Sequence, residues 1–189
     1  MLYRVFFIIL CCISLQACMT AASSGASAIY NRYSLENTYN NQMLAWSVQN
    51  KLDADPQLKY EAHITATSFE NIVLLTGQAP TQAMRMQAEA ITQSVPHTQK
   101  IINRIILTQP ISTLQKLQDT WLTTKVDSQV ITQGKLDPDD LKVVTENNTV
   151  YLIGSLKRAQ ANQVINMAKN TDGVQHVVTL IYYLEPKTA

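Results

Sequence analysis

Two similar strand-and-glycine segments, set 77 residues apart, constrain most strongly how this 189-residue chain can fold. Residues 71–77 read Asn-Ile-Val-Leu-Leu-Thr-Gly, and residues 148–154 read Asn-Thr-Val-Tyr-Leu-Ile-Gly. Both segments are rich in apolar and β-branched residues, as strands are, and each precedes a stretch with helical periodicity. The spacing predicts two copies of one structural unit of about 70 residues.

Each repeat contains five predicted elements in the order α-β-β-α-β. In the first repeat we expect helices at 42–54 and 81–94, with strands at 61–67, 71–77 and 100–107. In the second repeat we expect helices at 113–130 and 157–171, with strands at 141–145, 148–154 and 177–184. The crossover through the second helix makes its two flanking strands parallel, beside an antiparallel hairpin. The expected fold class is α+β, with a three-stranded mixed sheet packed against two helices in each domain.

The strand at 71–77 carries two further predictions. Four successive apolar residues at 72–75 indicate that both of its faces are covered. Gly77 at its end is expected to let the chain turn sharply into the following helix.

The first 18 residues have the layout of a lipoprotein signal peptide. Arg4 precedes an uncharged apolar run of about 11 residues, Val5–Leu15, whereas a membrane-spanning helix needs roughly 20. Leu15-Gln16-Ala17-Cys18 then fits a bacterial lipobox, in which the thiol of Cys18 is acylated and the chain is cut before it. An ordinary signal peptide with a chance cysteine is the alternative interpretation.

Cleavage before Cys18 would remove Cys11 and Cys12, so the mature chain would hold one blocked cysteine and no disulfide, thiol nucleophile or cysteine-based metal site. Loss of Arg4 would leave 14 basic against 14 acidic residues, and a net charge of about zero argues against a nucleic-acid partner. Met19 stands where an aspartate would favour inner-membrane retention, so we expect an outer-membrane location with the domains facing the periplasm.

The predicted organisation is a signal peptide at 1–17, a flexible tether from lipidated Cys18 at 18–38, a first domain at 39–109 and a second domain at 112–186. The tether prediction rests on the Ala, Ser, Gly and Asn composition and on weak periodicity. A small-residue helix at 21–28 is the alternative, which the Ser-Ser-Gly interruption disfavours.

No motif of a hydrolase, zinc protease or paired-carboxylate enzyme is present, nor a phosphate-cradling glycine loop. His63, His97 and His176 lack the spacing of metal ligands. We therefore expect a non-catalytic protein with no cofactor and no metal site.

The helix at 113–130 has two distinct faces. Its core stripe recurs every four residues, at Leu122, Val126 and Val130. Trp121 lies roughly 140° from that stripe, close to Lys125 and two leucines, which suits a membrane interface. The alternative is that Trp121 packs under a loop or against the other repeat.

The helix at 42–54 is similar, because Trp46 lies about 160° from a stripe formed by Leu44, Val48 and Leu52. Trp46 is open to three interpretations: it faces the membrane, the other repeat or a partner protein.

The chain resembles the BON domain family (bacterial OsmY and nodulation), and in particular dual BON-domain outer-membrane lipoproteins. The segments that carry the resemblance are 72–78, 119–126, 141–148 and 150–154, together with the lipobox. The resemblance covers nearly all of the predicted mature chain.

This resemblance implies a non-catalytic envelope protein that supports outer-membrane integrity, binds anionic phospholipid through its second domain and is associated with division sites and the β-barrel assembly machinery. Carried over to this chain, the phospholipid-binding residues are Trp121, Thr124, Lys125 and Ser128. Asp127 departs from this pattern, since a basic residue there would better serve an anionic headgroup.

Two functions are therefore expected. The first is a lipid-anchored module that recognises anionic phospholipid of the phosphatidylglycerol type through the Trp121 helix. The second is a protein-interaction adaptor that docks on an envelope assembly such as the β-barrel assembly machinery, without specific lipid recognition.

Overall fold

The computed structural model describes residues 25–134, 136–137 and 139–185. The predicted signal peptide at 1–17 and the lipidation site Cys18 lie outside these residues. The chain forms two units, Met1–Leu35 and Glu36–Ala189, and both repeats lie in the second. Within the described ranges, no helix combines the length and the apolar character that crossing a membrane requires.

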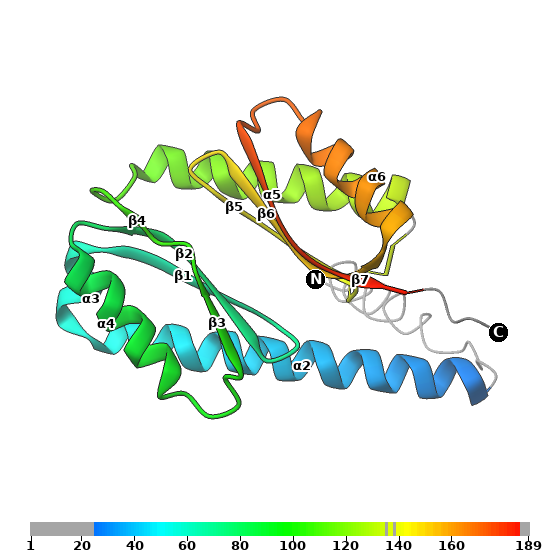
Figure 1. Ribbon diagram of the computed structural model, residues 1–189, viewed down its shortest axis with the longest axis horizontal. Coiled ribbons are helices and arrows are strands. Elements are labelled where there is room, and N and C mark those ends of the chain that lie inside the picture. Colours follow the sequence, from blue (N-terminus) through cyan, green and yellow to red (C-terminus); the bar gives the residue numbers. More distant parts are fainter. Residues whose placement is uncertain (1–24, 135, 138, 186–189) are drawn as a thin grey trace, which may run out of the picture. The chain divides into compact units, whose positions relative to one another are not determined.

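Each repeat folds into the predicted α+β domain (Figure 1). The first domain contains α2 (Gly25–Ala54), α3 (Pro56–Glu61), β1 (His63–Phe69), β2 (Ile72–Ala79), α4 (Gln82–Gln93), β3 (Lys100–Asn103) and β4 (Ile106–Leu107). The second domain contains α5 (Thr113–Gly134), β5 (Leu141–Glu146), β6 (Thr149–Lys157), α6 (Arg158–Lys169) and β7 (His176–Leu184). The short helix α3 was not predicted; Asp55 caps it and Pro56 starts it.

The strand pairing matches the predicted topology in both domains. β1 and β5 pair antiparallel with β2 and β6, and the last strands pair parallel with the same central strands. In the first domain the last strand is broken into β3 and β4 at Arg104 and Ile105. The backbone N–H of Arg104 still donates to the carbonyl of Leu75 at 2.8 Å, so the break keeps the chain beside β2.

Residues 25–38, expected as part of a flexible tether, are helical and continue directly into the packed part of α2. The segment contains no proline, and its one glycine stands at the first helical position. Once the packed turns near Leu44 exist, adding residues at the free end of a helix avoids the cost of nucleation. The tether prediction was therefore wrong for this range, and residues 18–24 lie outside the described residues.

Both hairpins close through two residues with positive φ. These are Glu70 and Asn71 between β1 and β2, and Asn147 and Asn148 between β5 and β6. Positive φ at both positions is the geometry of a type I′ turn, whose twist matches that of the flanking strands.

Gly77 was expected to form a turn into the next helix, but it lies inside β2. Gly154 likewise lies inside β6. A Cβ at Gly77 would overlap the carbonyl oxygen of His63, and one at Gly154 would overlap that of Asp140. Each glycine is needed because the neighbouring strand passes too close for a side chain.

Three hydrophobic clusters place the two domains back to back. One lies between β1–β2 and the helices α2 and α4, and a second lies between β5–β6 and the helices α5 and α6. The third joins the opposite faces of the two sheets, with Ile72 and Leu74 of β2 against Tyr151 and Ile153 of β6. The two central strands are therefore covered on both faces, as predicted for 72–75.

Candidate functional site

Helix α5 buries one face and exposes an apolar stripe on the other. Leu122 and Val126 are fully buried, which confirms the predicted core face. The exposed stripe repeats at helical spacing and is large: Leu114 is 75% exposed, Leu117 63%, Trp121 56% and Ile131 39%. The core of the domain is packed by the opposite face of α5. The exposed apolar stripe therefore does not contribute to packing within the domain.

The four predicted lipid-binding residues lie along this exposed side of α5. The amine of Lys125 sits 4.7 Å from the centre of the Trp121 ring, a cation–π geometry. Thr124 and Ser128 are exposed, and Thr124 donates its hydroxyl proton to the carbonyl of Thr120 at 3.0 Å. The structure thus brings an indole, an amine and two hydroxyl groups onto one helix face.

Asp127, which departs from the expected lipid-binding pattern, is half-buried on α5. Burial raises the pKa of its carboxyl group, and the positive charge of Lys142 on β5 lowers it. Burial is the larger effect, so the pKa of Asp127 is raised and its uncharged form is favoured relative to a free aspartate.

A groove of about 300 Å³ borders the same helix, between α5, β1 and β5. Its lining combines the two domains: His63, Thr65, Lys116, Asp119, Thr120, Thr123, Thr124, Val144, Thr145 and Glu146. Thr124 connects the groove to the Trp121 side of the helix, because it lies three positions after Trp121.

Glu146 and Asp119 are the most buried acidic residues of this groove, each 4% exposed. Oε1 of Glu146 accepts a hydrogen bond from the Gln78 amide at 2.7 Å, and its Oε2 lies 3.8 Å from Nε2 of His63. Burial raises the pKa of Glu146, while burial and then Lys116 lower the pKa of His63. Both shifts favour the uncharged form of each group.

Asp119 organises the closed end of the groove. Its carboxylate accepts from the backbone N–H groups of Asn147 at 2.7 Å and Asn148 at 2.9 Å, and from the amide of Gln115 at 3.0 Å. Sequence analysis missed Asp119, Lys116 and Glu146 because the groove also needs β1 of the other domain. The one usable signal was the run of threonines on α5 at helical spacing.

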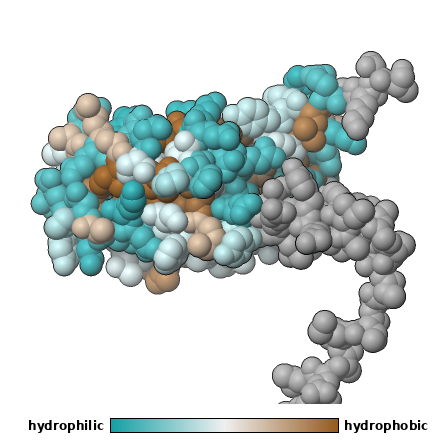
Figure 2. Space-filling model, turned by 90° about the horizontal axis from the view of Figure 1, so that it is seen from below, coloured by the Kyte–Doolittle hydropathy of each residue, from teal (hydrophilic) through white to brown (hydrophobic). Residues whose placement is uncertain are grey.

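Trp46 is 62% exposed on α2, which overturns the interpretation that it packs against the other repeat. Tyr39 and Met43 are exposed on the same helix, at 63% and 41%. Figure 2 views the side on which α2 lies and shows hydrophobic residues among hydrophilic ones. The core stripes of α2 and α5 are related by 78 residues, which places Met43 and Ser47 at the positions of Trp121 and Lys125.

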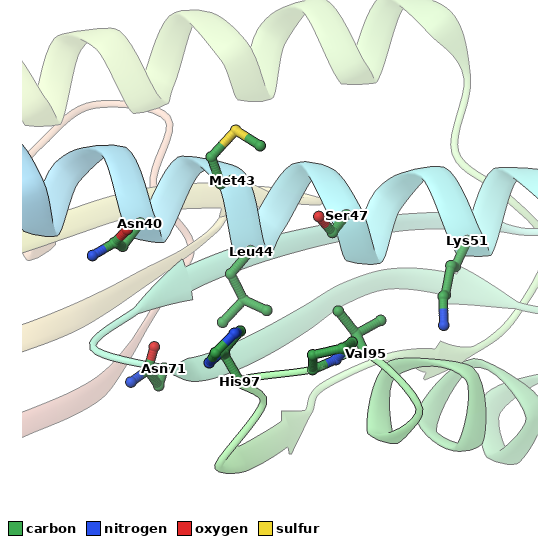
Figure 3. Close-up of a pocket in the computed structure, with 9 residues that line it drawn as sticks. Asn40, Met43, Leu44, Ser47, Lys51, Asn71, Val95 and His97 are labelled. Carbon is green, nitrogen blue, oxygen red and sulfur yellow. The ribbon is translucent and has the colours of Figure 1, made fainter.

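A second cavity of about 530 Å³ lies in the first domain, between α2 and the loop that follows α4. Leu44 and Lys51 extend from α2 toward the loop that carries Val95 and His97 (Figure 3). The amine of Lys51 donates to Ser94 of this loop at 3.2 Å, so the only cation lining the cavity among the described residues is already engaged.

The described residues contain no group of three or more His, Cys, Asp or Glu side chains that could hold a metal ion. His97 lies in the loop after α4 and His176 begins β7, while His63 lines the groove beside α5.

Comparison with known proteins agrees with this architecture. The family model of the BON domain matches residues 40–109 and 118–184. The outer membrane lipoprotein DolP of Haemophilus influenzae is 31% identical over 177 residues, covering 92% of each chain. The 21 kDa hemolysin of Actinobacillus pleuropneumoniae is 34% identical over 144 residues, covering 76% of this chain and 74% of the hemolysin.

Among solved structures, the C-terminal domain of CdsD, a structural protein of the type III secretion system of Chlamydia trachomatis, matches 76% of this chain and 67% of its own with 14% identity. Its TM-score of 0.31 is too low to carry an argument. The family model matches the chain twice, once over each α-β-β-α-β repeat, and the chain therefore belongs to the BON family, with two BON domains.

Proposed function

We propose that this chain is a non-catalytic outer-membrane lipoprotein that supports envelope integrity by binding anionic phospholipid through its second BON domain. Acylated Cys18 is its anchor, and the domains face the periplasm. The similarity to the outer membrane lipoprotein DolP along 92% of the chain supports the location. The lipid ligand is of the phosphatidylglycerol type.

The observation that carries this proposal is the exposed stripe of α5, with the Lys125 amine resting on the Trp121 ring. An indole prefers the headgroup region of a bilayer, and the lysine stem can lie on apolar surface while its amine reaches a phosphate. The stripe has the residues of an interfacial helix: large apolar side chains along one side and a lysine beside them.

The first domain lacks this combination at the corresponding place. Met43 replaces Trp121 there and Ser47 replaces Lys125, so neither the indole nor the amine is present. The two domains share a fold, and this difference in surface chemistry supports the second one as the lipid-binding domain.

The anchor and α5 would together give two attachments to one membrane. An anchored protein presents the second site at a high local concentration, so a weak headgroup contact is populated without high intrinsic affinity. The acyl chains supply most of the affinity, at about 0.8 kcal/mol per buried CH₂, and α5 supplies the preference for anionic lipid.

Vesicle co-sedimentation tests this proposal. The chain from residue 18 onward, carrying Cys18→Ser so that acyl chains do not dominate binding, is mixed with phosphatidylglycerol vesicles. Trp121→Ala should weaken binding about tenfold, because removing one interfacial aromatic forfeits roughly 1.5 kcal/mol. Trp46→Ala is the matched control, since it removes an equally exposed tryptophan from the first domain. Equal binding by Trp121→Ala and the parent would refute the role of α5.

A second function is supported by Tyr39, Met43 and Trp46, which form an exposed apolar row on α2 without a lysine beside it. We propose that this row lets the chain act as an adaptor on an envelope assembly such as the β-barrel assembly machinery. A photo-crosslinking residue at position 46 should give an adduct with a subunit of that machinery, identified by antibody. The same residue placed at 121 should give none. Adducts from both positions, or from neither, would contradict this assignment.

A further inference from the structure

We propose that the groove between α5, β1 and β5 binds the hydroxyl-bearing headgroup of an anionic phospholipid. Lys116 at its rim takes the phosphate, and Glu146 with the surrounding threonine oxygens accepts hydrogen bonds from the headgroup hydroxyls. This inference rests on the proposed lipid binding by α5 and specifies which part of the lipid is recognised, and by which residues.

The groove contains buried polar groups with unused hydrogen-bonding capacity. Thr145 is 7% exposed, lines the groove, and its hydroxyl makes no hydrogen bond with any residue the structure describes. Oε2 of Glu146 lies 3.8 Å from Nε2 of His63, which is beyond hydrogen-bond range. Buried polar atoms are nearly always paired in native proteins, so these two groups indicate a ligand that supplies partners.

Two threonines in the wall of the groove present acceptors to a ligand. Thr120 donates its proton to the carbonyl of Lys116 at 2.9 Å, and Thr124 donates to the carbonyl of Thr120 at 3.0 Å. Each hydroxyl has one proton, so the oxygens of these two threonines face a ligand as acceptors only. Together with the Glu146 carboxyl group they can accept hydrogen bonds from a ligand that donates through hydroxyls.

The charges favour a hydroxyl-bearing ligand over an ammonium. Lys116 is the one lysine or arginine among the described residues that line the groove. Its charge attracts a phosphate and repels the ammonium of an ethanolamine headgroup. The Asp119 carboxylate is already held by two backbone N–H groups and the Gln115 amide, and burial favours the uncharged forms of His63 and Glu146. The groove is therefore matched to a neutral polyol attached to a phosphate.

The position of the groove agrees with lipid bound at α5. Thr124 belongs both to the exposed side of the helix and to the groove lining, and it lies three positions after Trp121, on a neighbouring part of the helix surface. A phospholipid whose interface is marked by Trp121 would thus have its headgroup within reach of the groove.

Vesicles of phosphatidylcholine that contain an equal fraction of phosphatidylglycerol or phosphatidylmethanol test the inference. These two lipids carry the same single negative charge, and only the first bears free hydroxyls. The chain from residue 18 with Cys18→Ser should bind phosphatidylglycerol about threefold to tenfold more tightly, the factor expected from one or two net hydrogen bonds.

Glu146→Gln and Thr120→Val should bring this preference close to one, because each removes an acceptor for the headgroup hydroxyls. Glu146→Gln keeps the oxygen that accepts from the Gln78 amide and replaces the other carboxyl oxygen, which can accept in either protonation state, with an amide nitrogen that cannot. Thr120→Val removes the hydroxyl oxygen of an exposed residue, so this variant retains the fold. Thr132→Val is the matched control, because Thr132 makes the same kind of bond, to the carbonyl of Ser128, but does not line the groove.

The outcomes separate this inference from the proposed function. A preference for phosphatidylglycerol that survives both Glu146→Gln and Thr120→Val, or no preference in the parent, overturns the groove assignment and leaves lipid binding by α5 intact. Equal binding to phosphatidylethanolamine vesicles that is lost in the same variants would make the ammonium the ligand and overturn the hydroxyl assignment. Absence of binding to every anionic vesicle would refute the proposed function itself.

Discussion

At the scale of single residues, Gly154 shows how close approach of two strands dictates residue type. A Cβ there would lie 2.9 Å from the Cα of Leu141 and would overlap the carbonyl oxygen of Asp140. These are backbone atoms of β5 and its preceding turn, so they cannot move aside without breaking the β5–β6 pairing. Gly154→Ala should therefore lower the free energy of unfolding by roughly 1–3 kcal/mol or more, as overpacking does. Urea unfolding followed by circular dichroism measures the change.

Gly134→Ala is the control for this prediction. Gly134 ends α5, and the nearest atom to its added Cβ is a Leu136 side-chain carbon at 3.7 Å, an ordinary contact. Alanine also favours the helix by up to about 1 kcal/mol, so this variant should be neutral or slightly more stable. An equal loss of stability in both variants would show that close approach at β6 is not the cause.

At the scale of elements, the β5–β6 hairpin depends on a side chain from a helix. The turn residues Asn147 and Asn148 both have positive φ, which costs energy for residues other than glycine. The Asp119 carboxylate of α5 accepts from both of their backbone N–H groups and so holds this conformation. Asp119→Ala should lower the free energy of unfolding by roughly 2–3 kcal/mol, because it leaves the buried N–H of Asn148 and the partly buried N–H of Asn147 without their charged acceptor.

Thermal unfolding checks this prediction, with Asp172→Ala as the control. Asp172 is an exposed acidic residue of the same domain, and its loss should change stability by no more than about 0.5 kcal/mol. If Asp119→Ala unfolds at the temperature of the parent, the turn holds its shape without the helix. The sequence did not predict this role of Asp119, because its partner Asn147 is 28 residues away and the two meet only in the folded domain.

The elements differ in how much of them the sequence could predict. The two faces of α5 followed from the 3.6-residue period, and the structure confirms Leu122 and Val126 in the core with Trp121 outside it. The length of α2 did not follow, because residues 25–38 have weak periodicity and are helical by extension of a packed segment. The break between β3 and β4 also escaped prediction, since Arg104 and Ile105 stand within a run that reads as one strand.

At the scale of the whole molecule, the sequence indicated that β2 is covered on both faces but not what covers it. The cover is the other domain's sheet, through a cluster that includes Leu74 and Tyr151. Apolar residues at these positions are equally compatible with a helix, a second sheet or a partner as cover, so periodicity alone could not decide. The groove beside α5 was unpredictable for the same reason, because His63 and Glu146 meet only when the domains pack.

Glu146 lies in the polar part of the contact between the two domains and makes the free energy of unfolding depend on pH. Burial raises the pKa of Glu146 in the folded protein above its value in the unfolded chain, so folding favours the protonated form. This contribution to stability is fully present below the unfolded pKa and is lost as pH rises through the folded pKa. His63 acts in the opposite direction, since its lowered pKa costs stability as pH falls.

Glu146→Gln should remove the Glu146 part of this pH dependence while keeping an oxygen that accepts the Gln78 amide bond. The stability advantage of Glu146→Gln over the parent should therefore grow as pH rises through the folded pKa of Glu146 and then level off, in urea unfolding series at stepped pH. Gln78→Ala should instead destabilise the protein across the pH range, because it removes the donor that links the two domains. A Glu146→Gln variant whose difference from the parent is constant with pH would show that Glu146 does not change its protonation on folding. In that case the carboxylate would carry its charge within the contact, and Gln78 with Lys116 would have to balance it there.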